Sequence, residues 1–295
     1  MAFRFERGES VSGGLRRVLR EELESAASGL SGGEANPDDA IHEARKSVKK
    51  ARALLRLLRR ESGDVYSREN ARLRGIAARL SGLRDDVAVI ETFDRLTDRY
   101  KDEAGLEKLH PVRAGLAARR NKSSAGVGIA LHRAAAALLE ASKRVKAWHP
   151  PADEFTAIVS DFKATWLAGR KALKRAHKHP LPENFHELRK RIKDHWYYAR
   201  LLGEKKSARG KRLKRLETWL GNDRNLFLLR SRIAATPSLH GEKEAPELAL
   251  RLIDKCRKNL EDKALPLADR IYRKKPRGLV RRMKRLRDAG PANAV

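Results

Sequence analysis

Ile41-His-Glu-Ala-Arg-Lys-Ser-Val-Lys49 returns 144 residues later as Phe185-His-Glu-Leu-Arg-Lys-Arg-Ile-Lys193, with His, Glu, Arg and both Lys in the same places. The next helix and turn recur at an offset of 140 residues, where Leu80-Ser-Gly-Leu-Arg-Asp85 corresponds to Leu220-Gly-Asn-Asp-Arg-Asn225. Two repeated elements in the same order indicate an internal duplication. We therefore expect a single domain over residues 1–295, composed of two pseudo-symmetric helical bundles over residues 10–148 and 150–290.

The sequence around these blocks is helical nearly throughout. Segments between breakers have helical periodicity, and no run alternates convincingly with a period of two. Strong helix formers dominate, so the chain is predicted to be all-α, with helix breaks that include Gly82, Gly221 and the residue before Pro266. The predicted helices are Ser10–Ser28, Asp38–Arg60, Ser67–Leu80, Asp85–Lys101, Val112–Asn121, Ala125–Ala147, Ala152–His177, Glu183–Leu202, Ala208–Leu220, Asp223–Ala235, Ala245–Ala264, Pro266–Lys274 and Arg277–Asp288.

The charge balance is the unusual bulk property. There are 67 Lys and Arg against 38 Asp and Glu, which gives a formal net charge of +29. Such an excess repels itself in a compact protein, so an acidic partner is expected. Composition alone leaves nucleic acid, an anionic membrane and a phosphate polymer open.

Several classes of protein are excluded or disfavoured. The one cysteine, Cys256, rules out an internal disulfide and a thiolate metal cluster. No run reaches the roughly 18 apolar residues of a membrane span, and the N-terminal residues lack a signal peptide's apolar core, so we expect a cytoplasmic protein without a transmembrane segment. His177-x-His179 could contact a metal, but we interpret it as a turn. Asp85-Asp86 could be a catalytic carboxylate pair, but we interpret it as a helix start. We expect no catalysis, no cofactor and no metal.

The two repeated helices carry basic residues in a second stripe beside the apolar one. The basic stripe has the spacing of the apolar stripe but is shifted by one residue, about 100° of helical rotation. It therefore flanks the core, and it contains no acid. Lys46 and Lys190 extend it. Stacked cations need a counter-charge, and two rows facing a shared basic groove suit a linear anion. The stripes are His42, Arg45, Lys49, Arg52 and Arg56 in the first copy, and His186, Arg189, Lys193 and Arg200 in the second.

The two histidines lie near predicted helix N-termini, where a proline is followed by acids and backbone amides favour anions. Neighbouring cations are expected to hold His42 and His186 neutral in the free protein. A bound phosphate favours the charged form, so binding is predicted to tighten as the pH falls towards 6.

The His-Glu-x-Arg-Lys blocks and the Leu80 and Leu220 turns resemble the signature blocks of the CHAD family, the conserved histidine α-helical domain, from about Ser10 to Asp288. The resemblance implies non-catalytic binding of inorganic polyphosphate in a basic central pore, with targeting to polyphosphate granules as a further expectation. It also implies that Arg170 and Lys174, in a basic family helix, contribute. Tyr197 is a candidate hydrogen-bond donor to the ligand.

Nucleic-acid binding is the main alternative, because net charge supports it equally well. Single-strand binders usually interleave basic residues with exposed aromatics, whereas aromatics are 5% of this chain. There is no helix-turn-helix or zinc-finger pattern. We therefore expect only non-specific binding of RNA or DNA. Oligomeric state, and a contact of the basic run Arg281–Arg287 with a membrane or an acidic partner, are left open.

Overall fold

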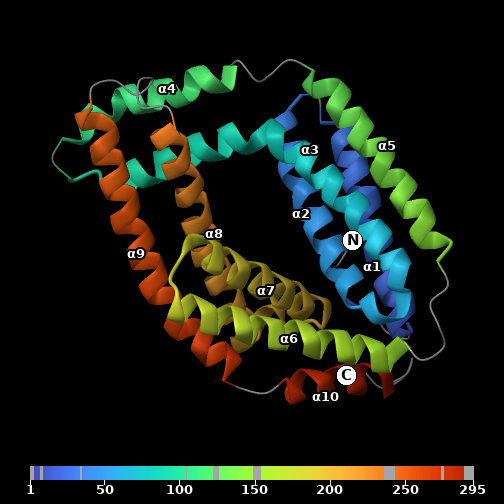
Figure 1. Ribbon diagram of the computed structural model, residues 1–295. Helices are drawn as coiled ribbons and strands as arrows, with labels where there is room; N and C mark the ends of the chain where they lie inside the picture. Colours follow the sequence, from blue (N-terminus) through green and yellow to red (C-terminus); the bar gives the residue numbers. More distant parts are fainter. Residues whose placement is uncertain are drawn as a thin grey trace.

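A computed structural model describes the chain except for residues 1–2, 7–8, 34, 104, 122–125, 149–153, 236–242, 274–275 and 289–295. The described part is all-α and has no strand, which confirms the predicted fold class (Figure 1). None of the described helices is apolar over a length that would cross a bilayer. The elements are α1 (Val11–Ser31), α2 (Pro37–Arg56), α3 (Arg59–Arg99), η1 (Leu106–Leu109), α4 (His110–Asn121), α5 (Val127–Lys146), α6 (Glu154–Lys178), α7 (Pro182–Leu201), η2 (Glu204–Lys206), α8 (Ala208–Ala235), α9 (Glu244–Tyr272) and α10 (Arg277–Asp288).

The two motif helices begin where their local sequence predicts. Proline occupies the first turn of both α2 and α7, where its missing N–H is harmless and its fixed φ favours the helix. In α2, the Asn36 side chain also accepts a hydrogen bond from the backbone N–H of Asp39. His42 and His186 therefore lie in the early turns of their helices, as predicted.

Three of the predicted helix breaks are wrong. α3 continues through Gly82, α8 through Gly221 and α9 through Pro266; inside α3 the backbone leaves helical geometry at Gly63, with φ 41° and ψ −109°. A lone glycine costs a helix only about 1 kcal/mol. Buried leucines such as Leu220 and Leu226 anchor α8 on both sides of its glycine, and their packing outweighs that cost.

The helices form a frame (Figure 1). α2, α3, α8 and α7 surround the centre, with α1 and α5 outside α2 and α9 outside α8. α1 packs against both α2 and α5, while α7 packs against both α6 and α8. α7 therefore lies between α6 and α8, and it also contacts α2.

The apolar side chains form two clusters. The larger combines α1, α2, the first part of α3, α5, α6 and α7 with the start of α8 and the end of α9. The smaller joins the end of α3 and α4 to the end of α8 and the start of α9. Each cluster draws on both halves of the chain, and α3, α8 and α9 contribute to both. The division into repeats over residues 10–148 and 150–290 stays a prediction.

Candidate functional site

α2 and α7 meet through their C-terminal halves. An Arg56 guanidinium nitrogen lies 3.1 Å from Asp194 Oδ1. Burial lowers the pKa of Lys50, and the charge of Arg200 on α7 lowers it further. The N-terminal halves of the two helices therefore diverge from this junction and form two neighbouring sides of the frame (Figure 1).

Four of the predicted binding residues come together at this junction, and we call Arg45, Lys49, Arg189 and Lys193 the cation cluster. Burial is the main cause that lowers the pKa of Lys49 to about 7, and repulsion from the other three members adds to it. Burial and Arg189 likewise lower the pKa of Lys193. The cluster is thus partly withdrawn from water and electrostatically strained in the free protein.

The second copy of the motif is more deeply placed than the first. The Nδ1 atom of His186 and the Nε atom of Arg189 are both buried without a hydrogen-bond partner among the described residues. Burial, followed by the charge of Arg224 on α8, lowers the pKa of His186 to about 4, which agrees with its predicted neutrality but makes burial, and not the neighbouring cations, the main cause. The side chain of His42 is 53% exposed, and its Nε2 lies 3.9 Å from Glu43.

The motif's glutamate forms the same ion pair in both copies. Glu43 lies 2.8 Å from Lys46, and Glu187 lies 3.1 Å from Lys190, each one helical turn apart. Both lysines are exposed. Lys46 and Lys190, which follow Arg45 and Arg189 in the sequence, therefore each have a carboxylate already beside them.

The predicted residues at the C-terminal ends of the stripes are held by the protein itself. Arg52 Nε donates to Asn70 Oδ1 at 2.9 Å, and Arg56 donates to the Arg52 carbonyl oxygen at 2.9 Å. Arg200 stacks over the Phe3 ring, 5.0 Å from its centroid. Tyr197 is 3% exposed and packs edge-on against the same ring, so its side chain belongs to the core.

The structure does not bring Arg170 and Lys174 to the cation cluster. Both line a separate cavity of about 420 Å³ between α6 and α9, together with Tyr272 and Arg273, and no residue of α2 or α7 lines it. His177 belongs to the same cavity, where its Nε2 atom lies 3.1 Å from Asp269.

Glu217 and Lys214 of α8 are functional candidates that lie outside the repeated motifs. The Glu217 carboxylate lies 3.4 Å from Lys193 Nζ and 3.0 Å from Lys214 Nζ. Although burial opposes it, these two lysines hold the pKa of Glu217 below its usual value. In the sequence, the one signal of this group is the spacing of Lys214 and Glu217 on one helix face.

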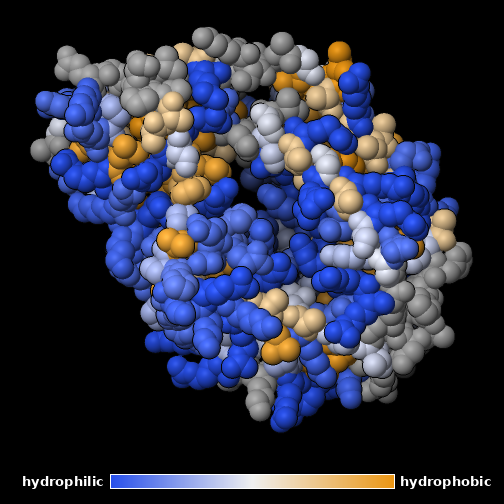
Figure 2. Space-filling view, in the orientation of Figure 1, coloured by the Kyte–Doolittle hydropathy of each residue, from blue (hydrophilic) through white to orange (hydrophobic). Residues whose placement is uncertain are grey.

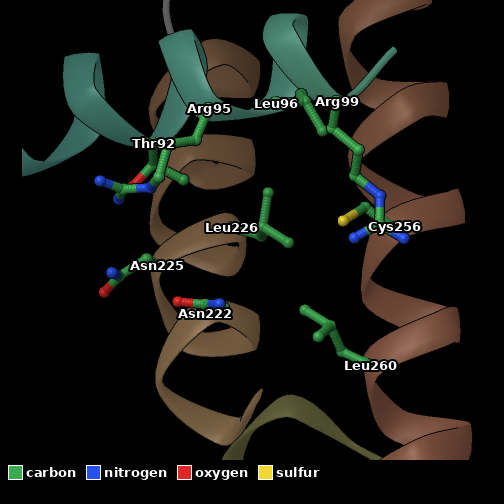
Figure 3. Close-up of a pocket in the computed structure, with 9 residues that line it drawn as sticks. All are labelled: Thr92, Arg95, Leu96, Arg99, Asn222, Asn225, Leu226, Cys256 and Leu260. Carbon is green, nitrogen blue, oxygen red and sulfur yellow. The ribbon is translucent and has the colours of Figure 1, made fainter. Parts of the chain in front are cut away.

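A cavity of about 100 Å³ between α3, α8 and α9 contains Asn225 and the thiol of Cys256 (Figure 3). Its two arginines diverge: Arg95 extends to the side of Asn225, Arg99 extends towards Cys256, and the apolar side chain of Leu226 lies between them. Burial raises the pKa of the thiol. These polar groups do not converge on one point, so this cavity is a poorer anion site than the cation cluster.

The face of the molecule seen in Figure 1 is hollowed near its centre, and residues of hydrophilic type surround the hollow (Figure 2). The fold and the site together define a class: an all-α protein whose two His-Glu-x-Arg-Lys helices meet at a partly buried group of cations.

The family model of the CHAD domain matches residues 16–233, so the chain belongs to the CHAD family. Among solved structures, the crystal structure of the CHAD domain from the plant Ricinus communis matches with a TM-score of 0.57 and 15% sequence identity, over 96% of this chain and 94% of that one. At that identity the match shows a shared fold. No curated protein matches the chain.

Proposed function

We propose that the protein binds inorganic polyphosphate along the N-terminal halves of α2 and α7, with the cation cluster at the centre of the site. The CHAD family is associated with polyphosphate binding in general. The positions from His42 to Lys49, and from His186 to Lys193, each span about 10 Å of helix. Because the two spans diverge from one junction, they form a bent track suited to a linear polyanion.

The observation that carries the proposal is the strain within the cation cluster. A lysine whose pKa has fallen to about 7 under burial and repulsion gains from any nearby negative charge. A phosphate chain supplies one charge after another along its length, whereas a single carboxylate does not. Arginine adds bidentate, charge-assisted contacts to phosphate oxygens.

The direct test compares long-chain polyphosphate with single-stranded DNA of matched charge at about physiological salt. The variant Arg45→Ala, Lys49→Ala, Arg189→Ala and Lys193→Ala is expected to lose at least tenfold in polyphosphate affinity, because contacts of a charged group contribute about 1.5–3 kcal/mol each. The matched control removes four exposed lysines outside the site, by Lys101→Ala, Lys163→Ala, Lys205→Ala and Lys206→Ala. Titration calorimetry gives the affinities, and circular dichroism checks that both variants remain helical.

Strong preference for polyphosphate, lost in the site variant and kept in the control, supports the proposal. Equal loss in both variants, or equal affinity for DNA, would instead mean that the +29 charge binds polyanions collectively. A further variant, Arg170→Ala with Lys174→Ala, measures whether the α6–α9 cavity contributes, as the family resemblance implies.

The affinity is expected to fall as the pH rises above 7, with Lys49 as the main cause. Polyphosphate raises the pKa of Lys49 above its free value of about 7, so binding takes up a proton at pH 7–9 and none well below 7. Lys49→Arg, which stays charged, is expected to flatten the profile between pH 6 and 9. His186→Gln is expected to keep it, because the pKa of His186 in the free protein, about 4, lies well below this range; Lys49 therefore replaces the histidine as the expected cause of the pH dependence. Identical affinity of the wild type at pH 6 and 9 would remove Lys49 from this role.

We further propose that binding occurs without catalysis, and that it attaches the protein to polyphosphate granules in the cytoplasm. Gel electrophoresis of long-chain polyphosphate after incubation with the protein is expected to show no shortening. In cells, the fluorescent fusion of the wild type is expected to collect on granules, and the fusion of the four-residue site variant is expected to remain dispersed.

A further inference from the structure

Glu217 places a carboxylate inside the cation cluster. Its side chain is 12% exposed, and that of Lys193, 3.4 Å away, is 17% exposed. Glu217 also acts on Lys49, where it opposes the repulsion from the other cations. This pair is therefore partly buried, unlike the solvated ion pairs at the surface, and its electrostatic effect is correspondingly larger.

We propose that Glu217 stands in for a ligand phosphate in the free protein and competes with polyphosphate for the cation cluster. This inference rests on the proposed function. Lys193 and Lys214 are the two cations that the carboxylate holds. A phosphate chain that reaches Lys193 must approach Glu217 and displace its contact or bind against its charge.

The sequence indicates that the carboxylate is not required by the helix packing. At the 140-residue offset of the Leu80 and Leu220 blocks, position 217 corresponds to Ala77. The flanking core positions stay apolar in both copies, with Ile76 matched by Leu216. The second copy thus carries an acid where the first carries a methyl group, at the edge of the proposed binding site.

Removal of this charge is expected to move stability and affinity in opposite directions. In the free protein, Lys193 and Lys49 lose a counter-charge, so the fold weakens. In the complex, the ligand itself neutralises these lysines, and its repulsion from Glu217 disappears. A purely structural role would instead lower both quantities, because loosened lysines bind less well.

The test uses Glu217→Gln, which keeps the shape of the side chain, and Glu217→Ala, which introduces the residue of the first copy. Affinity for long-chain polyphosphate is measured at pH 6, where Lys49 is charged. One unit charge several ångströms from the ligand is expected to change the affinity about fivefold, so both variants bind about fivefold more tightly. Their thermal midpoints are expected to fall by several degrees. The control Glu140→Gln removes an exposed carboxylate paired with Lys143 on α5 and is expected to change neither.

The outcomes separate the two proposals. If the wild type and the Glu140→Gln control bind polyphosphate, but both Glu217 variants bind it equally or less tightly, the competition by Glu217 is excluded while the binding function stands. If the wild type does not bind polyphosphate above its affinity for matched DNA, the proposed function itself fails. Tighter binding together with lower thermal stability supports the inference.

Discussion

Lys49→Met is expected to be more stable than the wild type and at least tenfold weaker in polyphosphate binding. The ammonium group has its pKa lowered from 10.5 to about 7, first by burial and then by Lys193, Arg45 and Arg189. At about 1.4 kcal/mol for each pKa unit the shift amounts to nearly 5 kcal/mol. Solvent screening at this partly exposed position reduces the expected gain in unfolding free energy to about 2 kcal/mol.

The pH dependence of this gain has a defined sign. Because the folded-state pKa lies below the unfolded-state value, folding of the wild type is penalised in full below pH 7, and the penalty disappears as the pH rises towards 10.5. Urea unfolding of both proteins is therefore expected to show the largest difference at pH 6 and a much smaller one at pH 10. Lys46→Met, at an exposed lysine paired with Glu43, is the control. A Lys49→Met protein less stable than the wild type at pH 6 would show that the ammonium is not strained.

Asp194→Asn is expected to lower the unfolding free energy by about 3 kcal/mol, because it leaves two partly buried arginines without their shared counter-charge. Asp194 is 4% exposed and lies 3.1 Å from Arg56 and 3.5 Å from Arg191. Burial raises the pKa of this carboxyl, and the arginines oppose that rise. Asparagine keeps the shape but cannot neutralise either guanidinium.

The double variant Arg56→Met with Asp194→Leu tests the cause. An apolar pair in place of a buried ion pair is often neutral or stabilising, so the double variant is expected to recover most of the loss when unfolding is followed in urea at pH 7. Asp262→Asn, at an exposed ion pair with Lys258, is expected to change stability little. If the double variant were as unstable as Asp194→Asn, unpaired charge would not be the cause of the loss.

Local pattern was sufficient to predict the helices and the faces that bear the stripes. Periodicity assigns Arg45 and Lys49 to one side of α2 without reference to any other helix. The predicted helix breaks at Gly82 and Gly221 are wrong, because a single glycine costs its helix little against the packing of the leucines around it. Such packing depends on side chains far away in sequence, so a local reading underestimates it.

The partners of the stripes could not be predicted from local pattern, because they depend on how helices cross. The crossing of α2 and α7 brings Lys49 to Lys193, whereas Arg170 faces α9 instead. The 144-residue offset matches Lys50 with Asp194, which reverses the charge. Each is neutralised by a different helix, Lys50 by Glu22 at 2.7 Å and Asp194 by Arg56. Arg56, a predicted binding residue, is thus paired with Asp194, a contact that its own helix does not reveal.

The unbroken course of α8 through both cores links them in rotational phase. The helix gives Leu220 to the larger core and Leu226 to the smaller one. The angle between these two side chains about the helix axis is therefore fixed by the number of residues between them. A residue inserted between them would turn everything beyond it by about 100° and advance it by about 1.5 Å. Leu226 would then no longer point into the smaller core. An insertion in a connection between helices leaves this rotational phase unchanged, whereas an insertion within α8 preserves it only when it adds about seven residues, close to two whole turns.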